Sequence, residues 1–507
     1  MTTLYNPLLN GFHPDPSVVK VGEDYYLATS TFEYLPGIPI HHSRDFENWT
    51  LIGHVALTEA QLGIADVPTA GGAWAPTIRF RDGVFHVIIT VAMARGMLHF
   101  TATDPAGPWS KGEVILGVDG EESVNGIDPD LAWDDDGTAY VTYSGLIMSG
   151  AQLGAHLGVQ QVKVDLDRHI ALEEPRSLWS GTGLMFPEAP HLYRHEGHWY
   201  LMIAEGGTER GHGISIARGD SPEGPFEPAP LNPLVSARST SRPVQNTGHG
   251  DLVVGPDGDW LVVLLGVRPR SMTRAFSALG RETFVTSVRW VDGWPEIDPV
   301  ELHPRPATAI IDDFDGTESD GDELDGEWIA VRRSPAELAD LTSRPGWLVL
   351  RGDGSTMDDA HPVFVGRRQQ HLTNAVTAGV DASAGVGGLS LRYDERFHVD
   401  LEVGGGSVTG RAVLGGLRQE WIHPFEGDVL DLHIVSGPPE GDGGFPRTSD
   451  IIRLAATIDG ERVELGEVDG RFLSSETTES FTGRVIGAYA VSGTFAVDRF
   501  AAEGHDE

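Results

Sequence analysis

The sequence predicts an all-β protein, with a five-bladed β-propeller at residues 1–300, a linker at 301–311 and a β-sandwich at 312–507. Three observations favour this interpretation. A short motif recurs five times within the first 300 residues. The 64 Gly and 32 Pro are dispersed along the chain and long helical periodicity is hard to find, as expected for short strands joined by many turns. The last two hundred residues or so alternate short apolar stretches with Gly-rich turns and lack the motif.

Each copy of the motif begins with a distinctive polar or aromatic residue and then follows the same order. A short apolar run leads to a turn with Gly beside Asp or Glu, and then to a strand rich in aromatic and β-branched residues, which indicates a β-hairpin. The five leading residues are Asp15, Trp74, Asp128, Glu188 and His249. Copies spaced by roughly fifty to sixty residues predict a radial array of four-stranded blades around a channel. If the first strand of each hairpin is the innermost strand of its blade, the five residues converge on one axis.

The recurrence stops near Trp294, and a stretch with three prolines follows, which predicts the linker. Beyond it, an acidic stretch at 312–325 leads into short alternating segments such as 387–393 and 484–489. About two hundred residues of this kind predict a β-sandwich. No acidic constellation recurs there, so we expect this domain to be structural or to shape the site of the first domain.

Composition excludes several classes of partner and chemistry. With 36 Lys and Arg against 75 Asp and Glu, the net charge is −39. Such a surface repels phosphate backbones and anionic lipids, so we expect a neutral substrate and neither nucleic acid nor membrane as a partner. The absence of cysteine excludes disulfides, thiolate metal sites and a cysteine nucleophile. The N-terminus lacks the pattern of a signal peptide and no apolar run is long enough to span a bilayer, so we expect a soluble, cytoplasmic protein.

Carboxylates and aromatic residues that face one channel, without a nucleophilic Ser or Cys pattern, suit glycoside hydrolysis. Glu188 lies in an apolar run, and because desolvation raises a carboxyl pKa, it is the better candidate for the acid. Asp15 lies between two prolines, a stiff frame that could hold a carboxylate towards a water. Asp128 is a third carboxylate, whose like charge would help keep Glu188 protonated. Each motif alone is weak, since Asp128 could form an Asx turn and Glu188 could be an ordinary strand-end carboxylate. Their matched placement in repeated units favours a shared site.

These motifs resemble glycoside hydrolase family 43, and within it the two-domain β-xylosidase and α-L-arabinofuranosidase group. The matching segments of the first domain occur in order, at 12–17 (FHPDPS), 31–43 (TFEYLPGIPIHHS), 74–76 (WAP), 126–129 (GIDP), 188–193 (EAPHLY), 204–208 (AEGGT), 248–251 (GHGD) and 279–283 (LGRET). The second domain resembles the C-terminal β-sandwich of that group at 367–371 (RRQQH), 392–396 (RYDER) and 483–487 (GRVIG).

The resemblance implies a five-bladed propeller and an inverting mechanism. It implies that Asp15 is the general base and Glu188 the general acid, and that Asp128 tunes the pKa and the position of Glu188. An inverting site needs its acid and base roughly 6.5–9.5 Å apart, so that a water fits between them.

The same resemblance implies the residues that bind the sugar. Phe32 and Trp74 would line the pocket, Arg281 would hydrogen-bond sugar hydroxyls and Thr208 is a further candidate. The related sandwiches add an aromatic loop to the pocket, for which Phe481 is the candidate here.

His249 has two interpretations. A lone His in a Gly-rich turn is usually structural. In the family, the corresponding His lies at the channel axis and can face a divalent ion, often calcium, or a water. A single imidazole is a poor calcium site without oxygen ligands or waters. We therefore expect no cofactor for the chemistry, and a structural calcium ion near the axis as one interpretation of His249.

The leading hypothesis is an exo-acting enzyme that releases xylose from the non-reducing ends of β-1,4-xylo-oligosaccharides. The nearest alternative is release of α-L-arabinofuranose from arabinosylated oligosaccharides, or both activities. A carbohydrate-binding propeller without catalysis and a purely structural interaction propeller are alternatives of other classes. The three carboxylates at matched positions speak against both. Relatives with this sandwich often form dimers or tetramers, so we expect a homo-oligomer.

Overall fold

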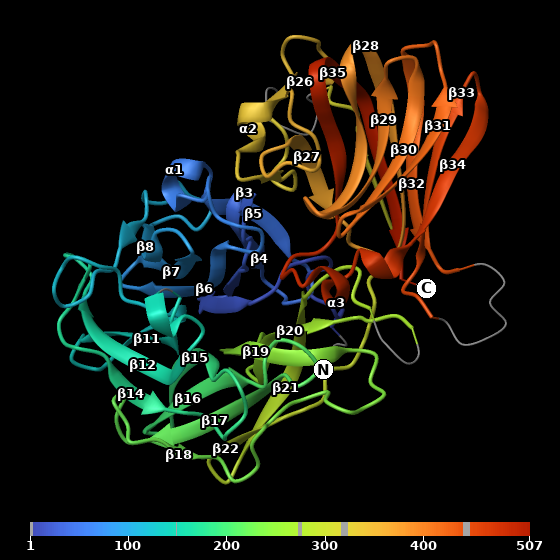
Figure 1. Ribbon diagram of the computed structural model, residues 1–507. Coiled ribbons are helices and arrows are strands. Elements are labelled where there is room, and N and C mark those ends of the chain that lie inside the picture. The colour runs from blue at the N-terminus through green and yellow to red at the C-terminus, as the bar shows by residue number, and fades with distance from the viewer. Residues whose placement is uncertain (1–3, 149, 272–275, 316–322, 440–446, 507) are drawn as a thin grey trace.

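The computed structural model describes residues 4–148, 150–271, 276–315, 323–439 and 447–506, and it consists of a five-bladed β-propeller followed by a β-sandwich (Figure 1). The predicted all-β fold is confirmed. Over the described residues, helices are limited to single turns at α1 (Glu59–Leu62), α2 (Pro335–Leu338), α3 (Ser475–Thr478) and two 3-10 turns (Gly150–Gln152 and Gly470–Phe472). Among the described residues, no helix is long and apolar enough to cross a membrane.

Each blade is an antiparallel sheet whose first four strands follow one another in sequence from the axis outwards, and in the third blade a fifth strand, Arg176–Trp179, also pairs with the third strand. The first blade contains β1 (Ser17–Val21), β2 (Asp24–Ala28), β4 (Gly37–Ser43) and β5 (Thr50–Ala56). The second contains β6 (Gly72–Arg81), β7 (Val84–Ala92), β8 (Gly96–Ala102) and β9 (Glu113–Val114). The third contains β10 (Ile127–Trp133), β11 (Ala139–Leu146), β12 (His156–Asp165), β13 (Ile170–Ala171) and β14 (Arg176–Trp179).

The last two blades complete the ring. The fourth contains β15 (Glu188–His195), β16 (His198–Glu205), β17 (Gly213–Gly219) and β18 (Glu227–Pro228). The fifth contains β19 (Gln245–Val254), β20 (Trp260–Val267), β21 (Glu282–Val291) and β22 (Trp294–Ile297). The innermost strands are therefore the first strands of the five recurring hairpins, β1, β6, β10, β15 and β19. The ends of these strands that carry the leading residues meet at the axis.

The sandwich is built around two long strands, β28 (Thr373–Asp394) and β35 (Val485–His505), which pair along most of their length. The other strands of this sheet system are β23 (Thr308–Asp312), β25 (Ala339–Asp340), β26 (Leu348–Asp353), β27 (Val363–Arg368), β29 (Phe397–Gly404), β30 (Ser407–Leu414), β31 (Leu417–Pro424), β32 (Val429–Gly437), β33 (Ile451–Ile458) and β34 (Glu461–Asp469). Alternate residues of these strands point inwards and form one apolar core, in which Leu389, Leu401, Ile434 and Phe495 are fully buried.

The boundary between the domains differs slightly from the predicted linker at 301–311. The last blade ends at Ile297, and β23 already begins at Thr308, where it pairs with β35 of the sandwich. The connection between them also closes the propeller, because the backbone N–H of His303 donates to the carbonyl of Asn6 at 3.0 Å.

The two domains meet over the first and last blades. A short strand of the second domain, β24 (Ala330–Val331), pairs with β3 (Tyr34–Leu35) of the first blade. The backbones also touch at Gly280 and Gly483, where an added Cβ would lie 2.4 Å from the carbonyl oxygen of Thr482 and 2.2 Å from that of Leu279, respectively. Only glycine allows this approach. This close contact holds the 479–483 segment of the sandwich against the mouth of the propeller. The segment directly follows α3, which Figure 1 shows beside the propeller.

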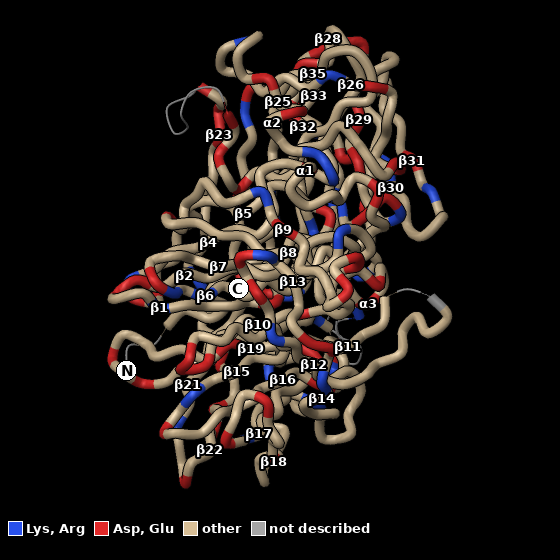
Figure 2. The backbone as a smooth tube through the Cα atoms, turned by 90° about the vertical axis from the view of Figure 1, so that its left-hand side faces the viewer, with Lys and Arg blue, Asp and Glu red and all other residues tan. Residues whose placement is uncertain are grey.

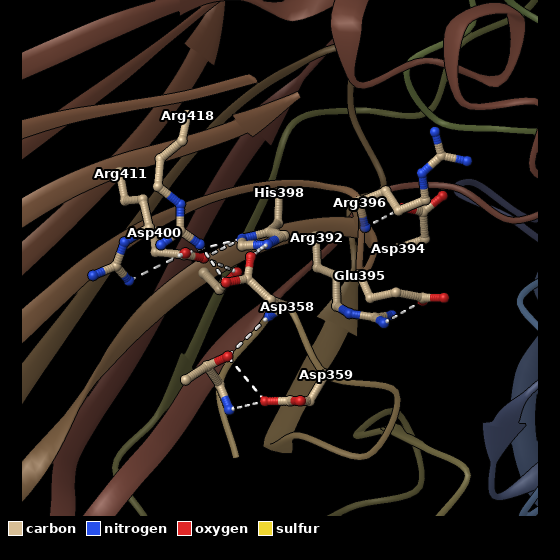
Figure 3. Close-up of polar contacts among 12 residues, drawn as sticks. Asp358, Asp359, Arg392, Asp394, Glu395, Arg396, His398, Asp400, Arg411 and Arg418 are labelled. Carbon is tan, nitrogen blue, oxygen red and sulfur yellow. Dashed lines mark hydrogen bonds and ion pairs between the residues drawn. The ribbon is translucent and has the colours of Figure 1, made fainter. Parts of the chain in front are cut away.

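Charged residues of both signs are spread over both domains (Figure 2). One group of polar contacts inside the sandwich surrounds His398 (Figure 3). Its Nδ1 lies 2.9 Å from Asp400 and its Nε2 lies 3.1 Å from Asp358, which also contacts Arg418. Burial alone would lower the pKa of His398, but the charge of Asp400 and the hydrogen bond to Asp358 outweigh it and raise the pKa to about 9. His398 is therefore a buried cation that ties the 354–361 loop to the sandwich.

Candidate active site

A repeated backbone conformation brings the site together. In every blade, one residue at the axial end of the innermost strand adopts a left-handed conformation, and Pro follows it in four copies and Gly in the fifth. These residues are Asp15 (φ 56°), Ala75 (φ 40°), Asp128 (φ 53°), Ala189 (φ 48°) and His249 (φ 46°). In blades two to five, the pairing of the first two strands also shifts register there, as at a β-bulge. The bulge turns the neighbouring side chains towards the axis.

This conformation corrects how the five copies match. Asp15, Asp128 and His249 occupy the left-handed position itself, whereas Trp74 and Glu188 each precede it by one residue. Glu188 therefore leaves the backbone in a different direction from Asp128, although both belong to the same motif.

Two positions beyond the left-handed residue, every blade places a buried polar side chain. The five are Ser17, Thr77, Asp130, His191 and Asp251. Arg79 of the second blade joins residues of the other four, because its guanidinium lies 2.7 Å from Asp130, 2.8 Å from Asp251, 3.0 Å from His191 and 3.2 Å from Ser17. The axis is thus filled by a cation held between two buried carboxylates.

The catalytic candidates lie in a cavity of about 300 Å³. All nine residues predicted for the site line this one cavity: Asp15, Phe32, Trp74, Asp128, Glu188, Thr208, His249, Arg281 and Phe481. Eight come from the five blades and Phe481 comes from the sandwich, so both domains build the site.

Asp15 is held as a carboxylate. Ser30 Oγ donates to Asp15 Oδ2 at 2.6 Å, Arg281 Nη1 donates to Oδ1 at 3.0 Å, and His249 Nδ1 lies 3.4 Å from Oδ1. Burial by itself raises the pKa of Asp15, but the charge of Arg281 and the hydrogen bond from Ser30 outweigh it, and the pKa lies below its ordinary value. Asp15 is ionised at neutral pH.

Glu188 is held in the opposite state. Burial is the largest cause, followed by the charges of Asp128 and Asp15, and together they raise the pKa of Glu188 well above its ordinary value. Burial and the charge of Asp15 also raise the pKa of Asp128, to about 7. Asp128 accepts a hydrogen bond from the backbone N–H of Ala189 at 3.2 Å, which favours its charged form, while none of the hydrogen bonds among the described residues reaches the Glu188 carboxyl. When only one of the two carboxyls Glu188 and Asp128 is protonated, the proton therefore lies on Glu188.

Aromatic rings form one wall of the cavity. The rings of Trp74 and Phe481 meet edge to face with centroids 5.6 Å apart, and those of Phe32 and Phe481 are 6.1 Å apart. The Arg281 guanidinium lies 5.3 Å from the Phe481 ring, and its Nη1 donates to Thr208 Oγ1 at 3.1 Å. One apolar wall beside a fixed donor suits a sugar ring, which has a flat apolar face and hydroxyls at its edge.

Residues 4–295 match the family model described as "Glycosyl hydrolases family 43", and residues 312–420 match "Beta xylosidase C-terminal Concanavalin A-like domain". The chain belongs to glycosyl hydrolase family 43. It is 35% identical to a non-reducing end alpha-L-arabinofuranosidase of Bacteroides ovatus, over 96% of this chain and 91% of that one. It is 32% identical to a beta-xylosidase of Bacillus subtilis, over 72% of each chain. Among solved structures, it is similar to xylan beta-1,4-xylosidase from Bacillus halodurans, with a TM-score of 0.86 and 29% identity, over 99% of this chain and 100% of that one.

The cavity of this family 43 protein is also lined by residues that the sequence did not single out. They are Ile127, Leu146, Phe186, Gly207, Glu209 and His212. Most lie in connections between strands, where no periodicity marks them. For Phe186, the sequence offers one indication of a place in the site, because Phe186 directly precedes Pro187 and Glu188 in the same apolar run.

The surroundings of His249 do not fit a calcium ion held by protein ligands. Burial is the main cause that lowers the pKa of His249 to about 3 and that of His212 to about 4, so both rings are neutral. The nearest carboxylate, Asp15, is bound by Arg281 and Ser30, and calcium prefers six or more oxygen ligands. Within the described ranges, no group of three or more His, Asp or Glu side chains is arranged to hold a metal ion. Family 43 enzymes generally need no cofactor for catalysis.

Proposed function

We propose that this family 43 hydrolase is an inverting exo-glycosidase, which releases xylose from the non-reducing ends of β-1,4-xylo-oligosaccharides. The observation that carries the proposal is the opposite tuning of two carboxyls in one small cavity, because the pKa of Asp15 is lowered and that of Glu188 is raised. One ionised and one protonated carboxyl are what glycoside hydrolysis requires. A cavity of about 300 Å³ is at the small end for ligand sites, which suits the removal of single sugars. The relatives named beta-xylosidase support the choice of sugar.

In the proposed reaction, Asp15 accepts a proton from a water as that water attacks the anomeric carbon. The bond between the anomeric carbon and the leaving-group oxygen breaks, and Glu188 gives its proton to that oxygen. Attack from the face opposite the leaving group inverts the anomeric configuration and yields α-xylose. Asp128 keeps the proton on Glu188 until the leaving oxygen becomes basic enough to take it.

Substrate binding follows from the other cavity residues. The aromatic wall of Phe32, Trp74 and Phe481 packs against the apolar face of the terminal sugar. Arg281, positioned by Asp15 and Thr208, donates to the sugar hydroxyls. The guanidinium of Arg281 therefore contributes both to sugar binding and to keeping the base Asp15 ionised.

Proton NMR of the purified protein with xylobiose tests the proposal, with the anomeric signals followed from the first minutes. Early α-xylose supports both the substrate and inversion. Early β-xylose would mean retention and would make Asp15 a nucleophile. The variants Asp15→Ala and Glu188→Ala should lose turnover while keeping the near-UV circular dichroism of the folded protein, and near-wild-type activity in either would overturn the assignment of roles.

Release of α-L-arabinofuranose is the second candidate, because the Bacteroides ovatus relative carries that activity in its name. Xylose and arabinofuranose present similar hydroxyls, so the Arg281 donor and the aromatic wall of the cavity suit both sugars. Comparing kcat/KM for 4-nitrophenyl β-D-xylopyranoside and 4-nitrophenyl α-L-arabinofuranoside on one preparation decides between them. A ratio that favours the arabinofuranoside more than tenfold would replace the leading proposal.

Three predictions from the sequence accompany the proposal. A homo-oligomer, dimer or tetramer, is tested by light scattering coupled to size-exclusion chromatography. A cytoplasmic location is tested by fractionation of the native cells. A calcium ion near His249 would need ligands that are mainly waters, and unchanged activity after EDTA treatment and dialysis would argue against it.

A further inference from the structure

The cavity has a second group of lining residues besides the aromatic cluster. This group is formed by Leu146 of the third blade and by Phe186, Gly207 and Glu209 of the fourth, the blade that also carries Glu188. In the proposed mechanism, the leaving-group oxygen receives its proton from Glu188. The wall on the Glu188 side is therefore the one that a leaving group must pass or contact.

Phe186 lies two residues before Glu188 and is unusual for an aromatic residue. Its φ is 53°, a strained backbone conformation for a bulky side chain, and 37% of its surface is exposed. Its only described ring partner is His156, with centroids 6.2 Å apart. Strain at an exposed aromatic residue beside a proposed acid indicates a functional constraint more than a structural one.

Glu209 lies close to Phe186, across Gly207. A Cβ added at Gly207 would lie 2.8 Å from Glu209 Oε2 and 3.5 Å from Phe186 Cδ2, so the carboxylate and the ring flank one bare stretch of backbone. Within the described part of the chain, no hydrogen bond or ion pair engages the Glu209 carboxylate. It also acts on the acid, since its charge is one of the causes that raise the pKa of Glu188.

We propose that Phe186 and Glu209 form the binding site for the leaving-group sugar, and that this site accepts a neutral sugar and disfavours one that carries a carboxylate. This inference rests on the proposed glycosidase function. The ring of Phe186 offers a flat apolar face for a second sugar, Glu209 accepts hydrogen bonds from its hydroxyls, and Gly207 places no side chain beside the ring and the carboxylate. A carboxylate on the leaving group would meet the unpaired negative charge of Glu209.

Phe186→Ala tests the aromatic half of the site, with xylobiose and methyl β-D-xylopyranoside as substrates. Both have an alcohol leaving group, but only xylobiose places a second ring on this wall. We expect kcat/KM for xylobiose to fall about tenfold, and that for the methyl xyloside to change less than about twofold. Phe186→Leu keeps an apolar side chain without the flat face and should resemble Phe186→Ala. Phe472→Ala is the matched control, because Phe472 is 38% exposed and lies outside the cavity.

Glu209→Gln tests the charged half of the site. Xylobionic acid, which is xylobiose oxidised at its reducing end, carries a carboxylate on the leaving group. The wild type should prefer xylobiose to xylobionic acid, and Glu209→Gln should reduce that preference about fivefold or more. Glu227→Gln, an exposed position of the same blade, should leave it unchanged.

The outcomes separate this inference from the proposed function. If the wild type cleaves both xylosides but Phe186→Ala slows them equally, or Glu209→Gln keeps the preference for xylobiose, the leaving-group site is wrong and the glycosidase stands. If the wild type cleaves neither xylobiose nor the methyl xyloside, the proposed function fails, and the leaving-group site fails with it.

Discussion

Arg281 of the fifth blade donates from Nη1 to Asp15 Oδ1 of the first blade at 3.0 Å, across the point where the propeller closes. The contact joins residues 266 positions apart in the chain, so the site exists only when the ring of blades is complete. It also fixes the protonation state of the proposed base, because the guanidinium charge offsets the effect of burial on the pKa of Asp15.

Replacing Arg281 by Met should therefore move the pH dependence of the enzyme. Without the cation, the pKa of Asp15 rises, and the base is protonated at pH values where the wild type is active. We expect the acidic limb of the kcat/KM profile to shift to higher pH by about one unit or more. Arg289→Met, an exposed position of the same blade, is the control. An acidic limb that stays in place in Arg281→Met would mean that Asp15 is not the group that titrates there.

Removing the charge of Asp128 should move the alkaline limb of the pH profile of kcat/KM. Its charge helps to raise the pKa of Glu188, so in Asp128→Asn that pKa falls and Glu188 loses its proton at lower pH. The alkaline limb of the kcat/KM profile should then shift to lower pH.

The role of Glu188 as the acid predicts a dependence on the leaving group. Glu188→Gln should lower kcat for xylobiose by about 10²–10⁴-fold, since the departing sugar needs a proton. A 2,4-dinitrophenyl xyloside, whose leaving group is stable as an anion, should lose far less. Equal losses on both substrates would contradict general acid catalysis by Glu188.

Much of this site could be predicted from the sequence, because the recurring motif marks the axial end of each inner strand. Asp15, Asp128, Glu188 and His249 were found in that way, and a propeller brings such positions together by symmetry. The one-residue offset of Glu188 relative to Asp128 could not be predicted, since a bulge depends on how the two strands pair. Phe481 was identified only through the resemblance to the family, because no pattern within the sandwich marks it.

Arg79 shows more clearly what a single sequence does not contain. Its carboxylate partners Asp130 and Asp251 lie 51 and 172 residues away, and nothing in the local pattern connects them. Phe186 and Glu209 were missed for a related reason. They lie in connections between strands, where neither alternation nor repetition distinguishes a binding residue from a solvated one.

The axial arginine predicts a large effect on stability. Arg79→Met leaves Asp130 and Asp251 as buried charges without their cation, and should lower the free energy of unfolding of the propeller by about 3–5 kcal/mol. Urea unfolding followed by tryptophan fluorescence measures it. Arg81→Met, two residues along the same strand, should have little effect. Adding Asp130→Asn and Asp251→Asn to Arg79→Met should recover part of the loss, and an equally unstable triple variant would show that the charges are not its cause.

From the position of Phe481 in the cavity wall, we predict that the sandwich takes part in substrate binding. The ring of Phe481 contacts both Trp74 and Phe32, and its loss would open the aromatic wall of the cavity to water. Phe481→Ala should lower kcat/KM for xylobiose by about tenfold or more, with little change in unfolding, because the residue lies at the rim of its own domain. Unchanged kinetics would limit the sandwich to a structural role.

His398 predicts how the stability of the sandwich depends on pH. Its pKa is raised to about 9 in the folded protein, whereas an unfolded His has a pKa near 6.5. A raised pKa means that the folded state binds the proton more tightly, so the stabilisation is fully present below about pH 6.5 and disappears as the pH rises through 9. The free energy of unfolding of the sandwich should therefore fall by up to about 3 kcal/mol between pH 6.5 and 9.5. His398→Gln should remove most of this dependence, while His505→Gln, at an exposed position, should keep it. A wild-type protein equally stable at both pH values would mean that His398 is neutral in the folded state and that Asp358 and Asp400 are held by Arg418 and Arg411 instead.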